Sequence, residues 1–301
     1  MGASANLLLS QGVQVNKKVR KAVIPAAGFG TRFLPATKSM PKEMVPIIDK
    51  PAIHYAVEEA VKAGITDIVF ITGRGKSAIE DYFDHSYELE DALRKKGKTE
   101  LLKEIEAISE MANIIYIRQK EPLGLGHAVL RAKDIIGDEP FAVILPDVLI
   151  TNGSDCLEGL IESYNQTGVS TITTTEVPDE QVHLYGIIDP EGTGEEFKIK
   201  GVVEKPKLED APSHFSILGR YVLDPVIFEY IENLGFSERG EIELTDAMLE
   251  MSKKEGLRGK NYKGTVFDTG DKLGFLQATV YMALEHEKLG KEFREYLKDT
   301  V

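Results

Sequence analysis

The fold of this chain is decided by the stretch Lys21-Ala-Val-Ile-Pro-Ala-Ala-Gly-Phe-Gly-Thr-Arg-Phe-Leu-Pro-Ala-Thr-Lys-Ser-Met-Pro-Lys-Glu-Met44. Its apolar run, residues 22–27, predicts a buried strand that leads directly into Gly28 and Gly30. Glycines at this point let the backbone turn sharply and bring its N–H groups close to a ligand. Backbone donors followed by cations predict a site for a polyanion, most simply a nucleotide phosphate chain. The cations lie within fourteen residues of Gly28: Arg32, Lys38 and Lys42.

Two better-known phosphate-binding motifs do not match this loop or its neighbour. The dinucleotide fingerprint needs a third glycine at position 33, where the chain has Phe33. The run Gly75-Lys76-Ser77 resembles the end of a P-loop, but that motif needs a glycine at position 70, which is Phe70. The first loop is therefore neither motif. An ordinary strand-to-loop connection with Arg32 in solvent stays open as the alternative.

Composition and charge narrow the class of ligand. The chain has 301 residues, of which 42% are hydrophobic, enough for the core of one large α/β domain or two smaller ones. A formal net charge of −13 argues against a nucleic acid or an anionic membrane as partner. Between Lys17 and Lys50, however, eight Lys or Arg face only Glu43 and Asp49, a local charge of +6. A basic island in an acidic protein indicates a small anionic ligand.

The single cysteine, Cys156, excludes an internal disulfide and predicts a cytoplasmic protein. No stretch approaches eighteen apolar residues, so no membrane span is expected. We expect residues 1–16 to form a flexible N-terminal extension and residues 17–301 to form a single domain. That domain would consist of two halves, residues 17–168 and 169–301.

The first half alternates strands and helices. Apolar runs predict strands at 67–72, 113–118 and 141–145, and helical periodicity predicts helices over 53–61, 76–83 and 127–136, with an exposed helical excursion over 86–110. This alternation predicts right-handed crossovers and a Rossmann-like three-layer α/β/α fold around a mostly parallel, mixed sheet. In such sheets, ligands bind beyond the carboxyl ends of the strands. Three loops that follow strands should therefore line one crevice: 28–42, 119–127 and 146–147.

After residue 168 the pattern becomes rich in strands. We expect these at 170–177, 185–189, 198–204, 216–223 and 265–268, with helices near 225–233 and 245–254. From Lys272 the tail is helical. This half predicts a smaller β-rich portion that covers the crevice and contacts a second substrate, followed by C-terminal helices. One face of the tail is apolar: Leu273, Leu276, Val280 and Leu284.

Five polar residues stand at or shortly after the ends of predicted strands. Asp147 and Asp268 each end an apolar run, and two such carboxylates would suit Mg²⁺, although each could equally be an ordinary turn-capping residue. Glu204 and Lys205 precede Pro206, and a break there could turn both side chains toward one ligand, the carboxylate to sugar hydroxyls and the ammonium to a phosphate. A solvated surface pair is the alternative. Gln119 could pair with a base edge.

Taken together, these motifs resemble those of a known family, the bacterial UTP–glucose-1-phosphate uridylyltransferases, or UDP-glucose pyrophosphorylases. The resemblance covers roughly residues 18–295, and Phe29 replaces the Leu more often found in that family. The inserted Ala-Thr-Lys-Ser-Met before Pro41 favours the uridylyl branch over the thymidylyl branch. Seven ordered blocks carry the resemblance: Ala26–Met44, Gln119, Leu123-Gly-Leu-Gly-His127, Leu145-Pro-Asp147, Tyr185-Gly-Ile-Ile-Asp189, Val203-Glu-Lys-Pro206 and Phe267-Asp-Thr-Gly-Asp271.

The resemblance implies a nucleotidyltransferase that converts UTP and glucose 1-phosphate into UDP-glucose and pyrophosphate with Mg²⁺. Residues 17–168 would be the nucleotide-binding half and residues 169–301 the sugar-binding half. The family and the apolar tail face together favour a homodimer or homotetramer.

The resemblance also implies a role for each candidate site residue. Uracil would be bound by Ala27, Gly28, Gly124 and Gln119, with Gly30 also in the nucleotide loop, and the phosphates by Arg32 and Lys42. Glucose would be bound by Gly186 and Glu204, with Lys205 on the sugar phosphate, and the metal by Asp147 and Asp268.

The implied chemistry needs no general base, since the attacking phosphate oxygen is already an anion. Catalysis would come from positioning two anions and stabilising charge in an in-line transition state, with Arg32, Lys42, Lys205 and Asp147 as the catalytic groups. Three alternatives stay open. They are a sibling enzyme that uses dTTP or ATP, a catalytically silent nucleotide-sensing subunit, and a glycosyltransferase that consumes a nucleotide sugar.

Overall fold

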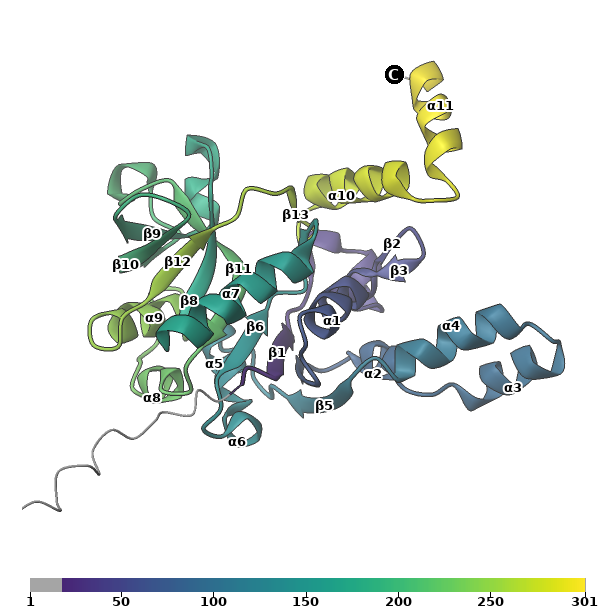
Figure 1. The fold of residues 1–301 in the computed structure, drawn as a ribbon, viewed down its shortest axis with the longest axis horizontal. Helices are drawn as coiled ribbons and strands as arrows, with labels where there is room; N and C mark the ends of the chain where they lie inside the picture. The colour runs from purple at the N-terminus through teal and green to yellow at the C-terminus, as the bar shows by residue number, and fades with distance from the viewer. Residues whose placement is uncertain (1–17, 301) are drawn as a thin grey trace, which may run out of the picture.

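A nine-stranded sheet runs through the whole protein in a computed structural model that describes residues 18–300 (Figure 1). Its strand order is β5-β4-β1-β6-β11-β8-β12-β10-β9. The strands are β1 (Lys21–Ala26), β4 (Asp67–Thr72), β5 (Asn113–Arg118), β6 (Phe141–Ile144), β8 (Thr171–Glu176), β9 (Gly186–Glu191), β10 (Glu196–Glu204), β11 (Phe215–Leu223) and β12 (Arg258–Asn261).

The first four strands of this order are parallel and carry helices on both faces. In β1 the side chain of Val23 joins one apolar cluster, and those of Ala22 and Ile24 join another on the opposite face. Because successive side chains of a strand point to opposite faces, a continuous apolar run is what a sheet covered on both sides requires. The expected three-layer arrangement is therefore present in this part. The layers use α1 (Ala52–Lys62), α2 (Ser77–Phe83), α4 (Thr99–Ser109) and α7 (Gly153–Thr167) on one face and α5 (Leu125–Leu130), α6 (Lys133–Ile136), α8 (Ile227–Glu232) and α9 (Leu244–Ser252) on the other.

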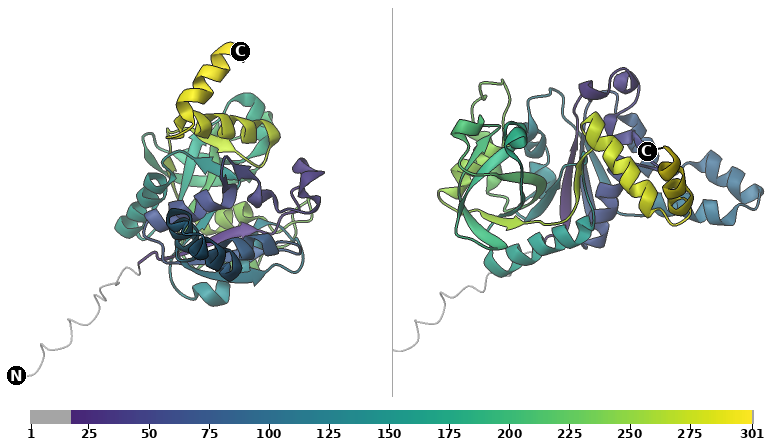
Figure 2. Two further views of the ribbon diagram at one scale, coloured as in Figure 1. Left: turned by 90° about the vertical axis from the view of Figure 1, so that its right-hand side faces the viewer. Right: turned by 90° about the horizontal axis from the view of Figure 1, so that it is seen from above.

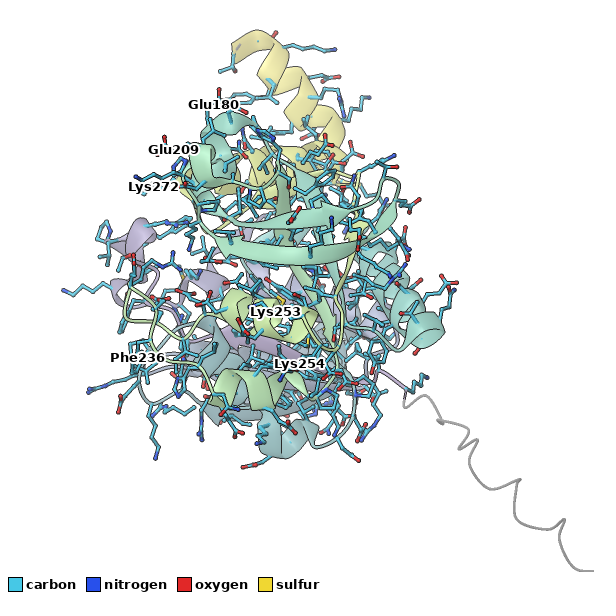
Figure 3. The ribbon with its side chains drawn as sticks, turned by 90° about the vertical axis from the view of Figure 1, so that its left-hand side faces the viewer. Glu180, Glu209, Phe236, Lys253, Lys254 and Lys272 are labelled. Atoms are coloured by element: carbon cyan, nitrogen blue, oxygen red, sulfur yellow. The ribbon has the colours of Figure 1, made fainter. Side chains whose placement is uncertain are left out.

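Beyond β6 the sheet is mixed rather than mostly parallel, in the half where a smaller β-rich portion was expected, and this half forms a closed barrel that was not predicted. β11 runs antiparallel to both of its neighbours, and β8–β12 is the parallel pair among the described strands of this half. The chain then pairs Ser216 of β11 with Ile187 of β9, which closes β11, β8, β12, β10 and β9 into a five-stranded barrel. Within the barrel, β9 and β10 run antiparallel because a short turn joins them, and a parallel pair would need a long crossover. Figure 3 shows this side, with Glu180 and Glu209 near the upper end of the barrel and Lys253 and Lys254 beside α9.

Several elements differ from the periodicity-based prediction. The chain from 86 to 110 forms two helices, α3 (Tyr87–Lys95) and α4, which fold back on each other at Gly97, where φ is 65°. The predicted helix over 127–136 is divided into α5 and α6. The helix α7 and the strand β12 were not predicted. The sequence of β12, Arg-Gly-Lys-Asn, has no hydrophobic pattern. β12 forms because it is hydrogen-bonded between β8 and β10.

Two pairs of helices lie at the periphery of the protein. α3 and α4 project at the end of the sheet opposite the barrel, and α10 (Lys272–Glu285) leads into α11 (Gly290–Thr300) on another side (Figures 1 and 2). The exposed tail face of α10 carries Leu273 and Leu276, which are 63% and 60% exposed. Among the described residues, no helix combines the length and apolarity that crossing a bilayer requires. The expected extension, residues 1–16, lies outside residues 18–300.

Candidate active site

Asp147 and Asp268 are brought together by two short strands. Directly after Asp147 comes β7 (Val148–Ile150), and it pairs antiparallel with β13 (Val266–Asp268), so that Val148 lies opposite Asp268. Thr269 then donates both its N–H and its hydroxyl to the carbonyl of Asp147, at 2.7 and 2.9 Å. Two carboxylates that are 121 positions apart in the sequence therefore share one corner of the structure.

Gly270 leaves a small space between the two carboxylates. A Cβ on this glycine would lie 3.0 Å from Asp147 Oδ2 and 3.0 Å from Asp268 Oδ1. The Gly270 N–H donates to Asp268 Oδ1 at 2.9 Å. Burial, together with the charge of Asp147, raises the pKa of Asp268 above its ordinary value. The two carboxylates therefore repel each other, and a cation bound between them would relieve that repulsion.

Lys42 supplies one positive charge to this corner. It begins the short 3-10 helix η3 (Lys42–Met44), and its Nζ lies 2.5 Å from Asp147 Oδ2. Burial opposes ionisation of both groups, but their mutual attraction prevails, so the pKa of Asp147 is lowered and that of Lys42 is raised. Lys42 is thus held as an ammonium next to an ionised carboxylate. The following residue, Glu43, is buried and pairs with Lys76 at 2.6 Å, which fixes η3 against the start of α2.

A cavity of about 460 Å³ opens beside the carboxylate corner. Asp147, Asp268 and Lys205 all line it. Arg32, from the 3-10 helix η1 (Thr31–Phe33), also lines the cavity, and its Nη1 donates to the carbonyl of Gly270 at 3.5 Å. The cavity therefore combines three carboxylates, those of Asp147, Asp268 and Glu176, with two cations from distant parts of the chain.

A second cavity of about 220 Å³ adjoins the first and shares Lys205 with it. Lys205 has a φ of 47°, so the strand β10 breaks there and Glu204 and Lys205 both reach this cavity, as the break at Pro206 predicted. Their charged groups lie 3.2 Å apart. Gly186 makes room for Glu204, because a Cβ there would lie 3.2 Å from Glu204 Oε2. Residues 186, 204 and 205 are thus brought together.

Gln119 lies in a separate cluster with Gly124 and His127. The Gln119 amide nitrogen is 3.1 Å from the carbonyl of Gly124 and 2.9 Å from Nδ1 of His127. Burial lowers the pKa of His127, which favours a neutral ring that accepts a hydrogen bond. With both amide hydrogens engaged, the carboxamide oxygen is the group left to accept a hydrogen bond. Gly124 adopts φ 99° and packs against the backbone of Ile242.

The glycine loop after β1 is open at one position and closely packed at another. A Cβ on Gly28 would meet no atom within 4 Å, whereas one on Gly30, where φ is 65°, would lie 3.0 Å from Cβ of Lys42. Thr37 donates to the carbonyl of Gly30 at 2.8 Å and closes the loop. Ala27, which follows β1, lies close to Gly73, which follows the neighbouring strand β4, because a Cβ on Gly73 would lie 2.8 Å from the Ala27 carbonyl.

Three residues that shape the site were not predicted from the sequence. Arg239 donates to Glu204 at 3.2 Å and to Glu243 at 2.6 Å, and it lines the second cavity. Arg220 and Glu59 form a buried ion pair behind the Asp147 turn. Arg239 could have been found from its position in a charged run between two predicted helices, Ser237-Glu-Arg-Gly-Glu-Ile-Glu243. No local signal distinguishes Arg220 or Glu59.

Comparison with known proteins shows which family this chain belongs to. The nucleotidyl transferase family matches residues 21–284, most of the chain. This chain belongs to the nucleotidyl transferase family. A UTP–glucose-1-phosphate uridylyltransferase 2 of Staphylococcus saprophyticus is 50% identical over 94% of this chain and 98% of its own. The family resemblance that the sequence motifs indicated is therefore confirmed.

Solved structures of other nucleotidyl transferases share the fold. A UTP-bound UDP-glucose pyrophosphorylase of Acinetobacter baumannii is 46% identical, with a TM-score of 0.87 over 93% of this chain and 98% of that one. A UDP-glucose pyrophosphorylase complexed with UDP-glucose is 41% identical, with a TM-score of 0.81 over 89% of this chain and 100% of that one.

Proposed function

We propose that the protein is a UTP–glucose-1-phosphate uridylyltransferase, which forms UDP-glucose and pyrophosphate from UTP and glucose 1-phosphate. The observation that carries this proposal is the cavity in which Asp147, Asp268, Arg32 and Lys205 converge, with Lys42 at its carboxylate corner. It is supported by similarity to solved structures that hold UTP or UDP-glucose. The charges around this cavity suit two phosphorylated substrates that must approach each other.

The carboxylate corner fits Mg²⁺. This ion takes one or two protein carboxylates and completes its octahedral shell with water and substrate phosphates. Asp147 and Asp268 both border the space left by Gly270, and among residues 18–300 no group of three or more His, Cys, Asp or Glu side chains forms an alternative metal site. We therefore assign Mg²⁺ to Asp147 and Asp268. When bound, the ion would neutralise phosphate charge as it develops during transfer.

The reaction is an in-line displacement. An oxygen of the glucose 1-phosphate forms a bond to the α-phosphorus of UTP, and the bond from that phosphorus to the bridging oxygen of the β-phosphate breaks, releasing pyrophosphate. The attacking oxygen is an anion already, so no proton has to be removed. Lys42 and Arg32 hold the triphosphate and stabilise the departing charge, and Lys205 holds the sugar phosphate in line for attack.

The uracil base and the glucose bind at separate places. Ala27, Gly28 and Gly30 approach the nucleotide through their backbone, and Gly124 does the same beside Gln119. The carboxamide oxygen of Gln119, oriented by His127, accepts the N3–H of uracil; cytosine lacks that donor and would be rejected.

The glucose ring lies against the backbone of Gly186, which lines the second cavity beside Glu204. Glu204 accepts hydrogen bonds from the sugar hydroxyls and Lys205 meets the sugar phosphate. Arg239, which pairs with Glu204, fixes the orientation of that carboxylate.

A direct assay tests this proposal against its alternatives. Purified protein with UTP, glucose 1-phosphate and Mg²⁺ should release pyrophosphate, and replacing UTP with dTTP or ATP should slow the release. Faster release with dTTP or ATP would assign the protein to a sibling activity. No release with any of the three nucleotides would leave the silent nucleotide-sensing subunit.

We also infer a homodimer or homotetramer. Leu273, Leu276 and Val280 on α10 are 63%, 60% and 39% exposed, although the opposite side of this helix packs on the body through Ala278, and α11 projects beyond it (Figure 2). Burying such a face against another copy would remove apolar surface from water. Sedimentation velocity should give a dimer or tetramer that Leu276→Glu dissociates, and a monomer at micromolar concentration would contradict this inference.

A further inference from the structure

Arg220 is the largest side chain that is fully buried in residues 18–300, and no catalytic role accounts for it. It lies on β11 and is 1% exposed. Its guanidinium faces Glu59 of α1, with Nε 2.6 Å from Oε1 and Nη2 2.8 Å from Oε2. Such a bidentate pair has the geometry that arginine and a carboxylate form most strongly.

The remaining N–H groups of Arg220 hold the turn that carries Asp147. Nη1 donates to the carbonyls of Leu145 and Gly219 at 3.1 and 3.2 Å, and Nη2 donates to the carbonyl of Val148 at 2.8 Å. Together with the two bonds to Glu59, all five N–H groups of the guanidinium are used. Two of these bonds are made to the backbone carbonyls on either side of residues 146 and 147, so the guanidinium bridges the two ends of the turn.

The strand β11 is shaped to place Arg220 there. Its register with β8 shifts between Ile217 and Tyr221, and Gly219 inside this bulge adopts φ 77°. Bulges of this kind redirect the side chains of a strand and are common beside active sites. Gly219 also accepts the N–H of Leu145 at 3.0 Å, so the bulge and the Asp147 turn are joined by backbone and side chain.

Glu59 needs space that a second glycine provides. A Cβ on Gly153, the first residue of α7, would lie 2.3 Å from Oε2 of Glu59. Any side chain at this position would therefore displace the carboxylate that orients Arg220. Gly153 has no left-handed φ, so its backbone conformation does not require glycine. The close approach of Glu59 does.

We propose that Arg220 and Glu59 form a positioning pair, which holds the Asp147 turn in the geometry that its carboxylate needs to bind Mg²⁺. Neither residue touches the substrates; both act through the backbone of residues 145–148. The link to Mg²⁺ rests on the proposed function, whereas the link to the turn does not.

Arg220→Lys and Gly153→Ala test the proposal with two readouts. Lysine keeps the charge facing Glu59 but cannot reach Glu59 and two carbonyls at once. Alanine leaves both charges in place and only displaces Glu59. For each variant we expect amides of residues 145–151 to exchange with deuterium at least tenfold faster. We also expect the half-saturating Mg²⁺ concentration to rise about tenfold, while the KM for UTP at saturating Mg²⁺ stays near that of the wild type.

Arg258→Lys is the matched control, because Arg258 pairs with Glu196 in the barrel at 3.2 Å. It should leave both readouts unchanged. Wild-type exchange in residues 145–151 for Gly153→Ala would overturn the proposal, even if Arg220→Lys fails to fold. Faster exchange with an unchanged Mg²⁺ requirement would overturn the link to Mg²⁺. If the wild type transfers no uridylyl group, the exchange measurement still decides whether the pair holds the turn.

Discussion

Replacing Gly270 by alanine perturbs the carboxylate corner with a single methyl group. Gly270 does not have a left-handed φ, so alanine is allowed by the backbone and acts only through the space it occupies. Its Cβ would lie 3.0 Å from one oxygen of each aspartate. Ordinary contact begins at 3.4 Å, so each oxygen must retreat by about 0.4 Å.

This displacement is large for a Mg²⁺ site. The ion requires oxygen distances of about 2.0–2.1 Å with a tolerance near 0.2 Å, which a shift of about 0.4 Å exceeds. Changes to groups that orient metal ligands commonly cost about 10–100-fold in metal affinity, which corresponds to about 1.4–2.8 kcal/mol. We therefore expect Gly270→Ala to raise the half-saturating Mg²⁺ concentration by about 10–100-fold.

The measurement is the initial rate of pyrophosphate release as a function of Mg²⁺ at fixed, saturating UTP and glucose 1-phosphate. Gly235→Ala is the matched control, because a Cβ there meets no atom within 4 Å and its φ is not left-handed. Melting temperature should not fall in either variant, since alanine restricts the unfolded chain more than glycine does. A Mg²⁺ dependence for Gly270→Ala within a factor of two of the wild type would refute the assignment of this corner to the metal.

Three further predictions follow from charges and burial. Lys205→Ala removes the ammonium assigned to the sugar phosphate, a contact worth about 1.5–3 kcal/mol, so kcat/KM for glucose 1-phosphate should fall about 10–150-fold in steady-state assays; wild-type efficiency would remove Lys205 from that role. Because burial and Asp147 raise the pKa of Asp268, its ionisation costs stability as the pH rises above the ordinary aspartate pKa, and this cost is complete above the raised pKa. Asp268→Asn should therefore raise the melting temperature at pH 7 without Mg²⁺; a lower melting temperature would contradict this. Burial, aided by Lys50, lowers the pKa of His54 to about 4, so its stabilising contribution is complete above about pH 6.5 and is lost as the pH falls toward 4; urea midpoints should decline across that window and decline less in His54→Asn.

Sequence reasoning succeeded where the chemistry depends on local pattern. The run 22–27 predicted a buried strand, and β1 covers residues 21–26. The aspartates at 147 and 268 were predicted to end strands; Asp268 ends β13, whereas Asp147 lies in the turn between β6 and β7, and both line the same cavity. A proline after Glu204 and Lys205 predicted the break that turns both toward one cavity. These features depend on residues within a few positions of one another, which is what a sequence pattern can report.

It failed where the structure depends on distant partners. The proximity of Asp147 and Asp268 rests on β7 and β13, each three residues long and too short for periodicity to reveal. β12 is a strand only because β8 and β10 lie on either side of it, and closure of the barrel rests on one pairing between β9 and β11. Arg220 and Glu59 are 161 positions apart. Tertiary hydrogen bonding, which no local window contains, decides these features.

The central claim is uridylyl transfer to glucose 1-phosphate, and phosphorus-31 NMR of a complete reaction tests it most directly. With UTP, glucose 1-phosphate and Mg²⁺, the spectrum should show UDP-glucose and pyrophosphate appearing one for one, and with UTP alone it should show no change. Pyrophosphate without UDP-glucose, or loss of added UDP-glucose in the absence of pyrophosphate, would contradict the account.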